Sequence, residues 1–216
     1  MNKYNINNII FDLGKVIVDV DESIVYQAFK DSSGAMARVK FSDWEEYLLF
    51  ETGKKSEEDF FNQVKQTFRL TNTSLSEIKE LWDSMIIGVS PEKISLLKSL
   101  IKRYRLFALS NTNSSHVKII NNFLWESYQI ERMSELFEKV YYSYEIGLDK
   151  PNKVIFEYVI CDANIIPEQT LFVDDNYQSI LTASQLGFKT IHLINPNQLL
   201  DKLKQMNIAI DIPIYG

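Results

Sequence analysis

The chain has 216 residues, of which 45% are hydrophobic and 24% are charged, and its formal net charge is −6 at pH 7. These values are ordinary for a globular protein with a sizeable core. An acidic chain without a run of lysine and arginine offers no electrostatic footprint for nucleic acid or for an anionic membrane, so we expect neither partner. No stretch approaches ~18 uninterrupted apolar residues, so we expect no transmembrane helix.

The N-terminal sequence and the cysteine content bear on the cellular compartment. Residues 1–5 contain no apolar segment of the kind found in signal peptides. Cys161 is the only cysteine, which excludes an intrachain disulfide and fits a reducing compartment. We therefore expect a cytoplasmic protein, and nothing in the sequence indicates an obligate protein partner.

The first predicted element is a buried strand over residues 9–11, which Asp12, Leu13 and Gly14 follow directly. Short apolar runs of this kind suit parallel strands that are covered on both faces. An aspartate at the end of such a strand can attack phosphorus and form an aspartyl-phosphate, which divides a difficult hydrolysis into two easier steps. An aspartate that caps a turn would have the same local sequence, so Asp12 alone does not separate the two interpretations.

Residues 20–88 differ from the rest of the chain because they contain helix signals and no clear strand. Sequences that begin at Ser42 and Ser56 resemble capping boxes, which mark helix starts. Apolar residues recur at helical spacing throughout this segment. The pattern predicts a small helical module that is inserted after the first strand.

Strand and helix signals alternate in the remainder of the chain. Ser90, followed by a proline, begins the first helix with a cap and a favoured first residue. The alternation predicts an α/β fold with a doubly wound, Rossmann-like parallel sheet and an inserted all-helical cap. We divide the chain into a core of residues 1–18 and 89–216 and a cap of residues 19–88. The later predicted elements are strands near residues 106–109, 140–141, 171–173 and 190–194, and helices near residues 114–123, 153–161, 179–186 and 197–205.

Polar residues follow two more of these strands, and a lysine lies in a loop between them. They are Ser110 and Asn111, then Lys150, then Asp174 and Asp175. In an open α/β sheet ligands bind outside the carboxyl ends of the strands, so these side chains can converge with Asp12 on one site. Each has a structural alternative, which is helix capping for Ser110, an exposed loop position for Lys150 and a turn for the acidic pair. Together, and in this order, they favour metal-assisted phosphoryl transfer.

The adjacent acids Asp174 and Asp175 point to a cation, because two carboxylates at the end of a buried strand repel each other. Mg²⁺ prefers oxygen ligands and needs only one or two carboxylates beside its waters and a substrate phosphate. Asp12 and Asp175 offer those carboxylates, and the backbone carbonyl of Gly14 offers a third ligand. We therefore expect Mg²⁺ as the cofactor.

Three of the polar residues are candidates for binding the phosphate group itself. The compact ammonium of Lys150 would bind phosphate and keep Asp12 ionised. Ser110 and Asn111 offer a hydroxyl and an amide close to a helix start, which is a favourable place for an anion.

The four motifs resemble, over nearly the whole chain, those of the haloacid dehalogenase (HAD) superfamily of phosphohydrolases. The resemblance implies a Rossmann-like core, a helical cap after the first motif and Asp12 as the nucleophile. It also implies Mg²⁺ bound directly by Asp12 and Asp175, with Asp174 close by or just behind. Residues 11–19 and 110–113 are similar, more narrowly, to the branch that holds a bacterial α-D-glucose-1-phosphate phosphatase and to the N-terminal phosphatase domain of soluble epoxide hydrolase.

Gly14 departs from the usual pattern of this family. Most of its phosphatases carry a second aspartate two residues after the nucleophile, which serves as general acid and base, and loss of such a group can cost ~10²–10⁴ in rate. The glucose-1-phosphate phosphatase branch shares this glycine, so the resemblance does not exclude activity. The glycine favours a substrate with a good leaving group, such as an anomeric phosphate, and disfavours a phosphomutase activity.

Several other residues invite a functional interpretation, and we expect structural roles for most of them. His116 is interpreted as a helix-surface or capping residue and His192 as a packed strand residue. Lys15 is a candidate to face the cap. The cap aromatics are interpreted as packing residues, namely Trp44, Tyr47 and Trp82.

We expect a Mg²⁺-dependent phosphatase that acts on a small phosphorylated metabolite, with a sugar phosphate favoured. Two alternatives stay open. One is a metal-free dehalogenase in which Asp12 attacks carbon; the acidic pair at Asp174 disfavours it, because bare carboxylates would repel an anionic substrate. The other is a catalytically weak module that binds a phosphometabolite or a partner, which only Gly14 favours.

Overall fold

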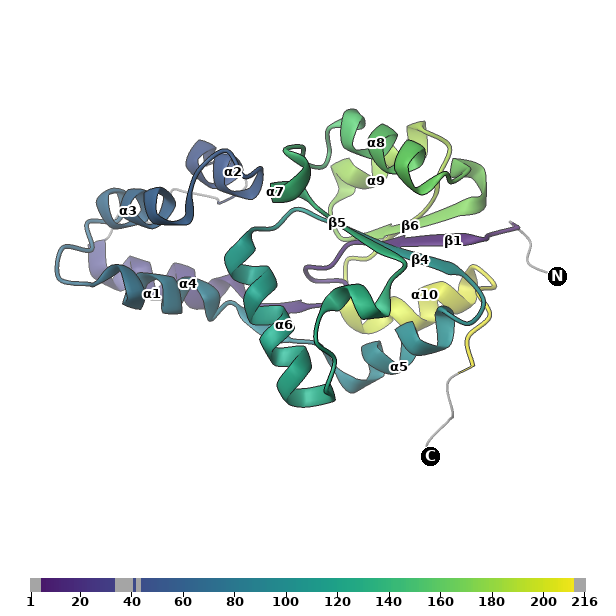
Figure 1. The fold of residues 1–216 in the computed structure, drawn as a ribbon, viewed down its shortest axis with the longest axis horizontal. Coiled ribbons are helices and arrows are strands. Elements are labelled where there is room, and N and C mark those ends of the chain that lie inside the picture. Colours follow the sequence, from purple (N-terminus) through teal and green to yellow (C-terminus); the bar gives the residue numbers. More distant parts are fainter. Residues whose placement is uncertain (1–4, 34–40, 42–43, 212–216) are drawn as a thin grey trace.

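The computed structural model describes residues 5–33, 41 and 44–211. Its centre is a five-stranded sheet in the order β5-β4-β1-β6-β7, and a separate pair is formed by β2 and β3 (Figure 1). The strands are β1 (Asn8–Phe11), β2 (Asp19–Val20), β3 (Ile86–Gly88), β4 (Arg105–Ser110), β5 (Lys139–Tyr142), β6 (Thr170–Asp174) and β7 (Lys189–His192).

The described helices surround the sheet and form a second body at one end of it (Figure 1). The α-helices are α1 (Glu22–Ser33), α2 (Glu45–Glu51), α3 (Glu57–Thr67), α4 (Leu75–Asp83), α5 (Pro91–Leu100), α6 (Ser114–Tyr128), α7 (Ser143–Ile146), α8 (Lys153–Ala163), α9 (Tyr177–Gln185) and α10 (Leu199–Gln205). Short 3-10 helices are η3 (Met133–Leu136), η4 (Pro167–Gln169) and η5 (Pro196–Gln198).

All strand pairs of the central sheet are parallel, and their carboxyl ends lie at one edge. Phe11 at the end of β1 lies opposite Ala108 of β4 on one side and Val173 of β6 on the other. The chain builds β4 and β5 on one side of β1 and then returns to build β6 and β7 on the other. The strand order therefore reverses at β1, and this reversal is where α/β sheets bind ligands. The predicted doubly wound parallel sheet is confirmed.

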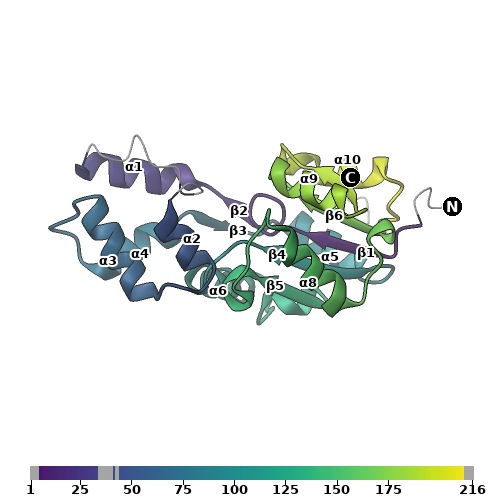
Figure 2. The same cartoon turned by 90° about the horizontal axis from the view of Figure 1, so that it is seen from above.

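Helices cover both faces of the sheet, as its apolar runs require. Ile9 and Phe11 belong to the core under α5, α6 and α10, whereas Ile10 belongs to the core under α8 and α9 (Figure 1, Figure 2). Successive strand residues face opposite sides, so a strand with two covered faces must be apolar throughout. This explains why β1, β4 and β6 could be located from the sequence.

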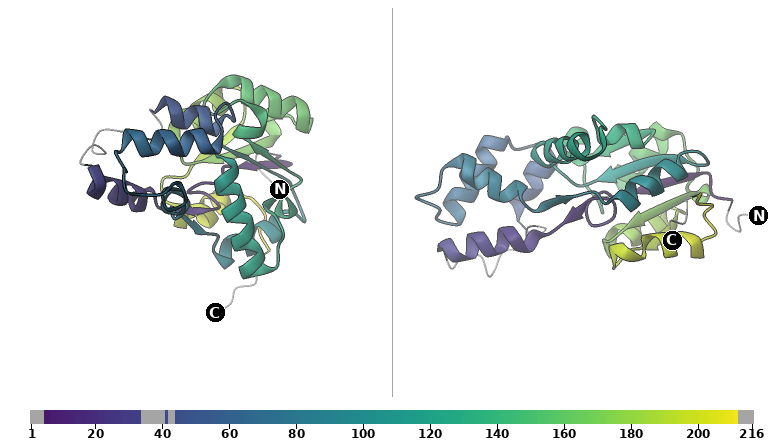
Figure 3. Two further views of the ribbon diagram at one scale, coloured as in Figure 1. Left: turned by 60° about the vertical axis from the view of Figure 1, so that its left-hand side comes forward. Right: turned by 90° about the horizontal axis from the view of Figure 1, so that it is seen from below.

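Helices α1 to α4 form a helical module with its own hydrophobic cluster, and the views in Figure 3 show this module at one end of the molecule. Phe60 of α3 and Trp82 of α4 are both 0% solvent-exposed. Their ring centroids lie 5.0 Å apart in an edge-to-face arrangement. Aromatic pairs in this geometry add to the stabilisation that burial provides. The module is therefore held together by packing of its own.

Serines begin two helices of the module. Ser56 accepts a hydrogen bond from the backbone N–H of Asp59 and caps α3, as its position in the sequence predicts. Ser74 and Glu77 form a complete capping box at the start of α4, a helix start that is not among those predicted above. The capping box predicted at Ser42 lies outside the described residues.

The segment predicted to contain no strand differs from that prediction at its two ends. β2 and β3 pair as antiparallel strands where the chain enters and leaves the helical module. They have two and three residues, which is too short for a period-two pattern, and their partners meet only through the tertiary fold. The module is thus helical but joins the core through a small β-ribbon.

Some predicted bounds also differ from the structure. α6 continues to Tyr128, five residues beyond the predicted end at 123, and β7 ends at His192. α7 was not predicted, because a four-residue helix has no recurring apolar face. Among the described residues, no helix combines the length and the apolar character that crossing a membrane would require.

Candidate active site

Three aspartates meet at the carboxyl end of the sheet. Asp12 follows β1, Asp174 ends β6 and Asp175 comes next, and each contributes a carboxylate oxygen that lies within 4.8 Å of the other two. The backbone N–H of Asp12 donates to the carbonyl of Val173 at 2.8 Å. The pairing of β1 with β6 therefore brings together carboxylates that are far apart in the sequence.

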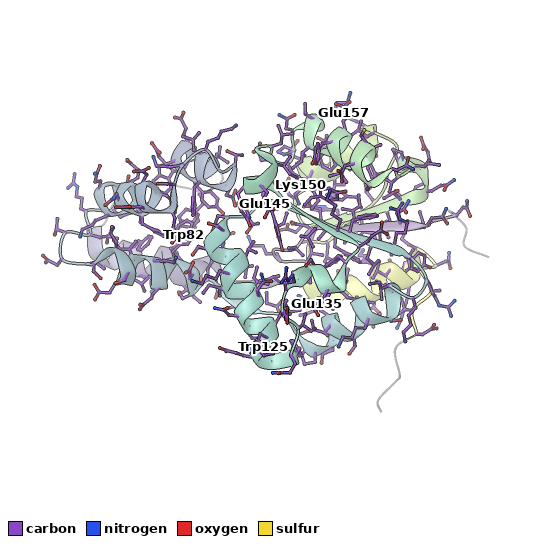
Figure 4. All side chains as sticks on the ribbon, viewed as in Figure 1. Trp82, Trp125, Glu135, Glu145, Lys150 and Glu157 are labelled. Carbon is purple, nitrogen blue, oxygen red and sulfur yellow. The ribbon has the colours of Figure 1, made fainter. Side chains whose placement is uncertain are left out.

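Lys150 lies between two of these carboxylates. Its Nζ atom is 3.0 Å from Oδ1 of Asp12 and 2.6 Å from Oδ2 of Asp174. The side chain is only 4% exposed, and that of Asp174 is fully buried. Figure 4 shows Lys150 on the side of the sheet that faces the helical module. The alternative of an exposed loop lysine is therefore wrong.

Asn111 holds the backbone of Lys150 in place. The amide Nδ2 of Asn111 donates to the carbonyl of Lys150 at 2.8 Å, and Oδ1 accepts the N–H of Lys150 at 2.9 Å. Lys150 precedes Pro151 through a cis peptide bond. An amide nitrogen has a second N–H, so phosphate binding by Asn111 stays a prediction beside this observed contact.

Burial and mutual repulsion shape the ionisation of the cluster. Burial raises the pKa of Asp12 to about 7, with Lys150 acting against the shift and Asp174 and Asp175 adding to it. Burial likewise raises the pKa of Asp175, and repulsion by Asp174 adds to the shift. Burial alone would lower the pKa of Lys150, but the attraction of Asp12 and Asp174 outweighs it and raises this pKa to about 12. The single ammonium group of Lys150 thus interacts with the carboxyl groups of three aspartates.

This donor set fits a divalent cation with a preference for oxygen. Three carboxylates gather in this space, where burial favours the protonated forms of Asp12 and Asp175, and a bound cation would reverse that preference. Both oxygens of Asp174 have protein partners, because Oδ2 contacts Lys150 and Oδ1 accepts the N–H of Asn176 at 2.7 Å. Asp12 and Asp175 are therefore better placed as direct ligands than Asp174.

A cavity of about 1090 Å³ opens in front of these groups. Gly14 and Ser110 line it from the core, and Tyr47 and Glu51 line it from the helical module. Ser110 is buried at the end of β4, where the register places it beside the same edge as Asp12. The cavity thus has one wall that carries the acidic cluster and another that the helical module supplies.

The two histidines differ from their predicted environments. His116 was expected on a helix surface or at a cap, but its side chain is 5% exposed and lines the cavity. His192 was expected to be packed within its strand, but it is half-buried and its Nε2 lies 2.9 Å from the carbonyl oxygen of Asp175. Neither position has a sequence signal for these contacts, since both depend on neighbours that are remote in the chain.

Lys15 and the predicted packing residues take mixed positions. Lys15 lines the cavity and contacts Glu22 of α1 at 2.8 Å, so it does face the helical module. Trp82 is fully buried in the module, as predicted (Figure 4). Trp44 and Tyr47 are only partly buried against the same cluster, and Tyr47 also lines the cavity.

Glu51 is a cavity residue that no motif in the sequence indicates. It ends α2 after an apolar run and is 6% exposed. Burial raises its pKa to about 7. A glutamate at the end of an amphipathic helix is usually solvated, so only the docking of α2 on the core could identify this one.

A parallel α/β sheet with a buried Asp–Lys–Asp cluster at its switch point defines a candidate enzyme of the Rossmann-like class, and the comparisons with known proteins define the family. Residues 9–193 match the family of haloacid dehalogenase-like hydrolases. A D-ribitol-5-phosphate phosphatase from Bacteroides thetaiotaomicron is 33% identical over 188 residues, which cover 86% of this chain and 90% of that protein. The chain therefore belongs to the haloacid dehalogenase-like hydrolase family, as its motifs predict.

Solved structures agree with this assignment. A predicted HAD-like family hydrolase from Porphyromonas gingivalis has 30% sequence identity and a TM-score of 0.79, covering 93% of this chain and 98% of its own. A HAD family enzyme from Bacteroides thetaiotaomicron, solved in complex with magnesium and inorganic phosphate, has 29% identity and a TM-score of 0.75, covering 86% of this chain and 93% of its own. The narrower resemblance to the glucose-1-phosphate phosphatase branch stays a prediction.

Proposed function

We propose that this chain is a Mg²⁺-dependent phosphatase that hydrolyses a small phosphorylated metabolite, with a sugar or sugar-alcohol phosphate as the substrate class. The observation that carries the proposal is the buried cluster in which Lys150 contacts Asp12 and Asp174 in the wall of the cavity. The relative that acts on D-ribitol 5-phosphate and the neighbour that binds magnesium and phosphate support it.

Residues 19–88 would serve as the cap in this proposal, with residues 1–18 and 89–216 as the catalytic core. The separate hydrophobic cluster of α1 to α4 and their contribution to the cavity wall support this division. A cap can exclude water and select the substrate, and its motion can limit turnover.

Asp12 is the nucleophile of the proposed reaction. The described hydrogen bonds and ion pair of its carboxylate use Oδ1, which accepts the N–H of Leu13 at 2.7 Å and lies 3.0 Å from Lys150. Oδ2 would therefore attack phosphorus. A bond forms between Oδ2 and phosphorus while the bond from phosphorus to the substrate oxygen breaks, and the leaving alkoxide takes a proton from solvent. Water then attacks phosphorus and returns Asp12 and inorganic phosphate.

Lys150, Ser110 and Asn111 would bind the transferring phosphoryl group. Lys150 is held in the protonated form by its acidic neighbours and places a fixed positive charge beside the carboxylate of Asp12. The Ser110 hydroxyl and the loop that follows β4 offer hydrogen-bond donors at the same edge of the sheet. Preorganised donors of this kind stabilise charge that develops in the transition state.

Asp12, Asp175 and the carbonyl of Gly14 would hold Mg²⁺, with Asp174 next to them. When bound, the ion neutralises charge on the phosphate oxygens and on the carboxylates that would otherwise repel the substrate. The overall charge of the chain makes this neutralisation necessary, because a protein of net charge −6 repels a phosphate ester in general.

The dehalogenase alternative is weaker than the phosphatase proposal. An acidic cluster without a cation would repel a haloacid carboxylate, and the relative that covers most of the chain at 33% identity is a phosphatase. A module that binds without turnover is favoured only by the absence of an acid at Gly14.

The test is phosphate release from a panel of sugar, sugar-alcohol and nucleotide phosphates, measured with Mg²⁺ and with EDTA. We expect release that needs Mg²⁺ and that falls by at least ~10³-fold in Asp12→Asn, because the nucleophile is removed. Asp201→Asn is a matched control, since Asp201 is exposed on α10 outside the cavity.

Three results would contradict the proposal. Release that persists in Asp12→Asn would exclude Asp12 as the nucleophile. Halide release that survives EDTA would favour the dehalogenase. Binding of a phosphorylated ligand with no turnover of any substrate in the panel would favour the binding module.

A further inference from the structure

The cavity contains two buried polar side chains that the proposed phosphate chemistry does not use. Glu51 ends α2 in the helical module, and His116 lies in the first turn of α6 in the core. Both line the cavity that Asp12 and Lys150 also line. They are 6% and 5% exposed. Buried polar groups are normally satisfied by hydrogen bonds, so the partners of these two side chains are informative.

Glu51 has more hydrogen-bonding capacity than its protein partner uses. The hydroxyl of Tyr47 bonds its carboxyl group. A carboxylate offers about four lone-pair sites, and one hydroxyl donor fills one of them. The acid is therefore equipped to bind further hydroxyl donors that enter the cavity.

The position of Glu51 is fixed against the core through Ser143. The Ser143 hydroxyl donates to the backbone carbonyl of Glu51 at 2.6 Å and accepts the backbone N–H of Thr112 at 2.9 Å. Thr112 lies two residues after Ser110, in the loop that follows β4. The end of α2 is thus tied to the loop that is proposed to bind phosphate, which sets the distance between the phosphate site and Glu51.

His116 presents a donor without a protein partner. Oδ1 of Asn113 accepts the backbone N–H of His116 at 3.1 Å, so the amide nitrogen of Asn113 is the atom that lies 3.3 Å from Nδ1 of the imidazole. Nδ1 must then accept, which places the ring proton on Nε2. Nε2 is buried, and it has no hydrogen-bond partner among the residues that the structure describes. Burial also lowers the pKa of His116 to about 4, so the ring is neutral near pH 7.

We propose that Glu51 and His116 bind the hydroxyl groups of the substrate's organic part and so select a polyhydroxylated phosphate monoester. This inference rests on the proposed phosphatase function and assigns its specificity. A hydroxyl group both donates and accepts; of the residues that line the cavity, Glu51 has a carboxyl group that accepts and His116 has a buried imidazole N–H that donates. A ligand without hydroxyls would leave the buried imidazole N–H unpaired and Glu51 with its remaining acceptor sites unfilled, which is how sites reject such analogues by large factors.

The test compares two substrates of the same chain length, D-ribitol 5-phosphate and pentyl phosphate, under Mg²⁺. We expect the wild type to prefer ribitol 5-phosphate by at least ~100-fold in kcat/KM. Glu51→Gln and His116→Phe should each narrow that ratio by at least ~10-fold, mainly through a higher KM for ribitol 5-phosphate. His116→Phe keeps an aromatic ring beside Trp82, whose ring stacks on His116 at 6.0 Å between centroids.

Glu45→Gln is the matched control, because Glu45 lies on the same helix as Glu51, is exposed and does not line the cavity. It should keep the wild-type ratio within twofold. Equal losses on both substrates in Glu51→Gln and His116→Phe would show a structural role and overturn the inference, as would an unchanged ratio. If either variant fails to fold, the other variant and the wild-type ratio of kcat/KM values decide the inference. A wild type that does not prefer ribitol 5-phosphate over pentyl phosphate overturns the inference. A wild type that hydrolyses neither these esters nor any in the broader panel would instead overturn the phosphatase proposal.

Discussion

The ammonium group of Lys150 lies 2.6 Å from Oδ2 of Asp174, and Asp174 is fully buried at the end of β6. This contact fixes a charged side chain from the loop before α8 against the strand that pairs with β1. Lys150 is thereby held 3.0 Å from Oδ1 of Asp12 before any substrate binds. The preorganisation is what the proposed chemistry needs, because no reorientation is required when charge develops.

Replacing Lys150 by methionine should therefore affect both activity and stability. Removing one partner of a buried ion pair leaves uncompensated charge, so we expect the free energy of unfolding to fall by about 3 kcal/mol without Mg²⁺. We also expect phosphatase activity to be lost. Urea unfolding and phosphate release would measure the two effects.

Lys139→Met is the control for that experiment. Lys139 pairs with Asp162 at 2.6 Å, but its side chain is 48% exposed, so the substitution should change the free energy of unfolding by less than about 1 kcal/mol. A Lys150→Met variant as stable and as active as the control would contradict the proposed role of the buried lysine.

Introducing an acid at Gly14 should restore a general acid to the site. A Cβ atom at Gly14 would have Val20 Cγ2, at 3.9 Å, as its nearest contact, which is ordinary van der Waals packing. Gly14→Asp should therefore fold, and we expect turnover of alkyl phosphates, which have poor leaving groups, to rise at least ~10-fold. Aryl phosphates, whose leaving groups need less protonation, should gain less.

Gly14→Asn has nearly the same shape and no acid, so it separates proton transfer from steric effects. It should show no gain on alkyl phosphates. If the asparagine and aspartate variants change turnover equally, the missing acid does not limit the reaction.

The stability of the protein should depend on the ionisation of Glu51. Burial raises its pKa in the folded state to about 7, above its ordinary value of 4.5, with Asp149 adding to the shift and Tyr47 and Lys150 opposing it. The folded state therefore binds the proton more tightly, and the free energy of unfolding falls as pH rises from about 4.5 to 7. The full effect of this group is about 3 kcal/mol.

Glu51→Gln removes this ionisation, so its stability relative to the wild type should improve progressively over that pH range and then level off. Urea unfolding at several pH values would measure the difference. Glu45→Gln, at an exposed position of the same helix, should show no such trend. A pH-independent difference between Glu51→Gln and the wild type would mean that Glu51 ionises normally in the folded protein.

Ser143→Ala should loosen the contact between the helical module and the core. It would leave two buried backbone groups without their side-chain partner, the carbonyl of Glu51 and the N–H of Thr112. We expect a loss of about 2 kcal/mol in the free energy of unfolding. Because the position of Glu51 would relax, we also expect a rise in KM of about tenfold for the best substrate.

Ser84→Ala is the control, because it removes the hydroxyl of an exposed serine that does not join the helical module to the core. Ser84 bonds the carbonyl of Leu81 at the exposed end of α4, so its loss should stay within about 0.5 kcal/mol and leave KM unchanged. Comparable losses in both variants would argue against a specific role for Ser143.

The elements that were predicted well are those whose own residues reveal their environment. The central residues of β1, β4 and β6 are buried on both faces, so each strand contains an uninterrupted apolar run that locates it in the sequence. Asp12, Ser110 and Asp174 end or directly follow these strands, and a parallel sheet must collect such residues at one edge. The family resemblance follows from the same residues in the same order.

Other features were decided only by contacts between distant segments. The β2–β3 ribbon, the burial of Glu51 and the cavity position of His116 all arise where the helical module meets the core. A residue's own neighbours in sequence do not record which remote surface will cover it, so a glutamate at a helix end and a histidine in a first turn looked ordinary. The sequence by itself thus determined the sheet and the order of the candidate site residues through local hydrophobicity and chain order. Only the tertiary structure decided which residues line the cavity, because its wall is built from the core and from the separately packed helical module.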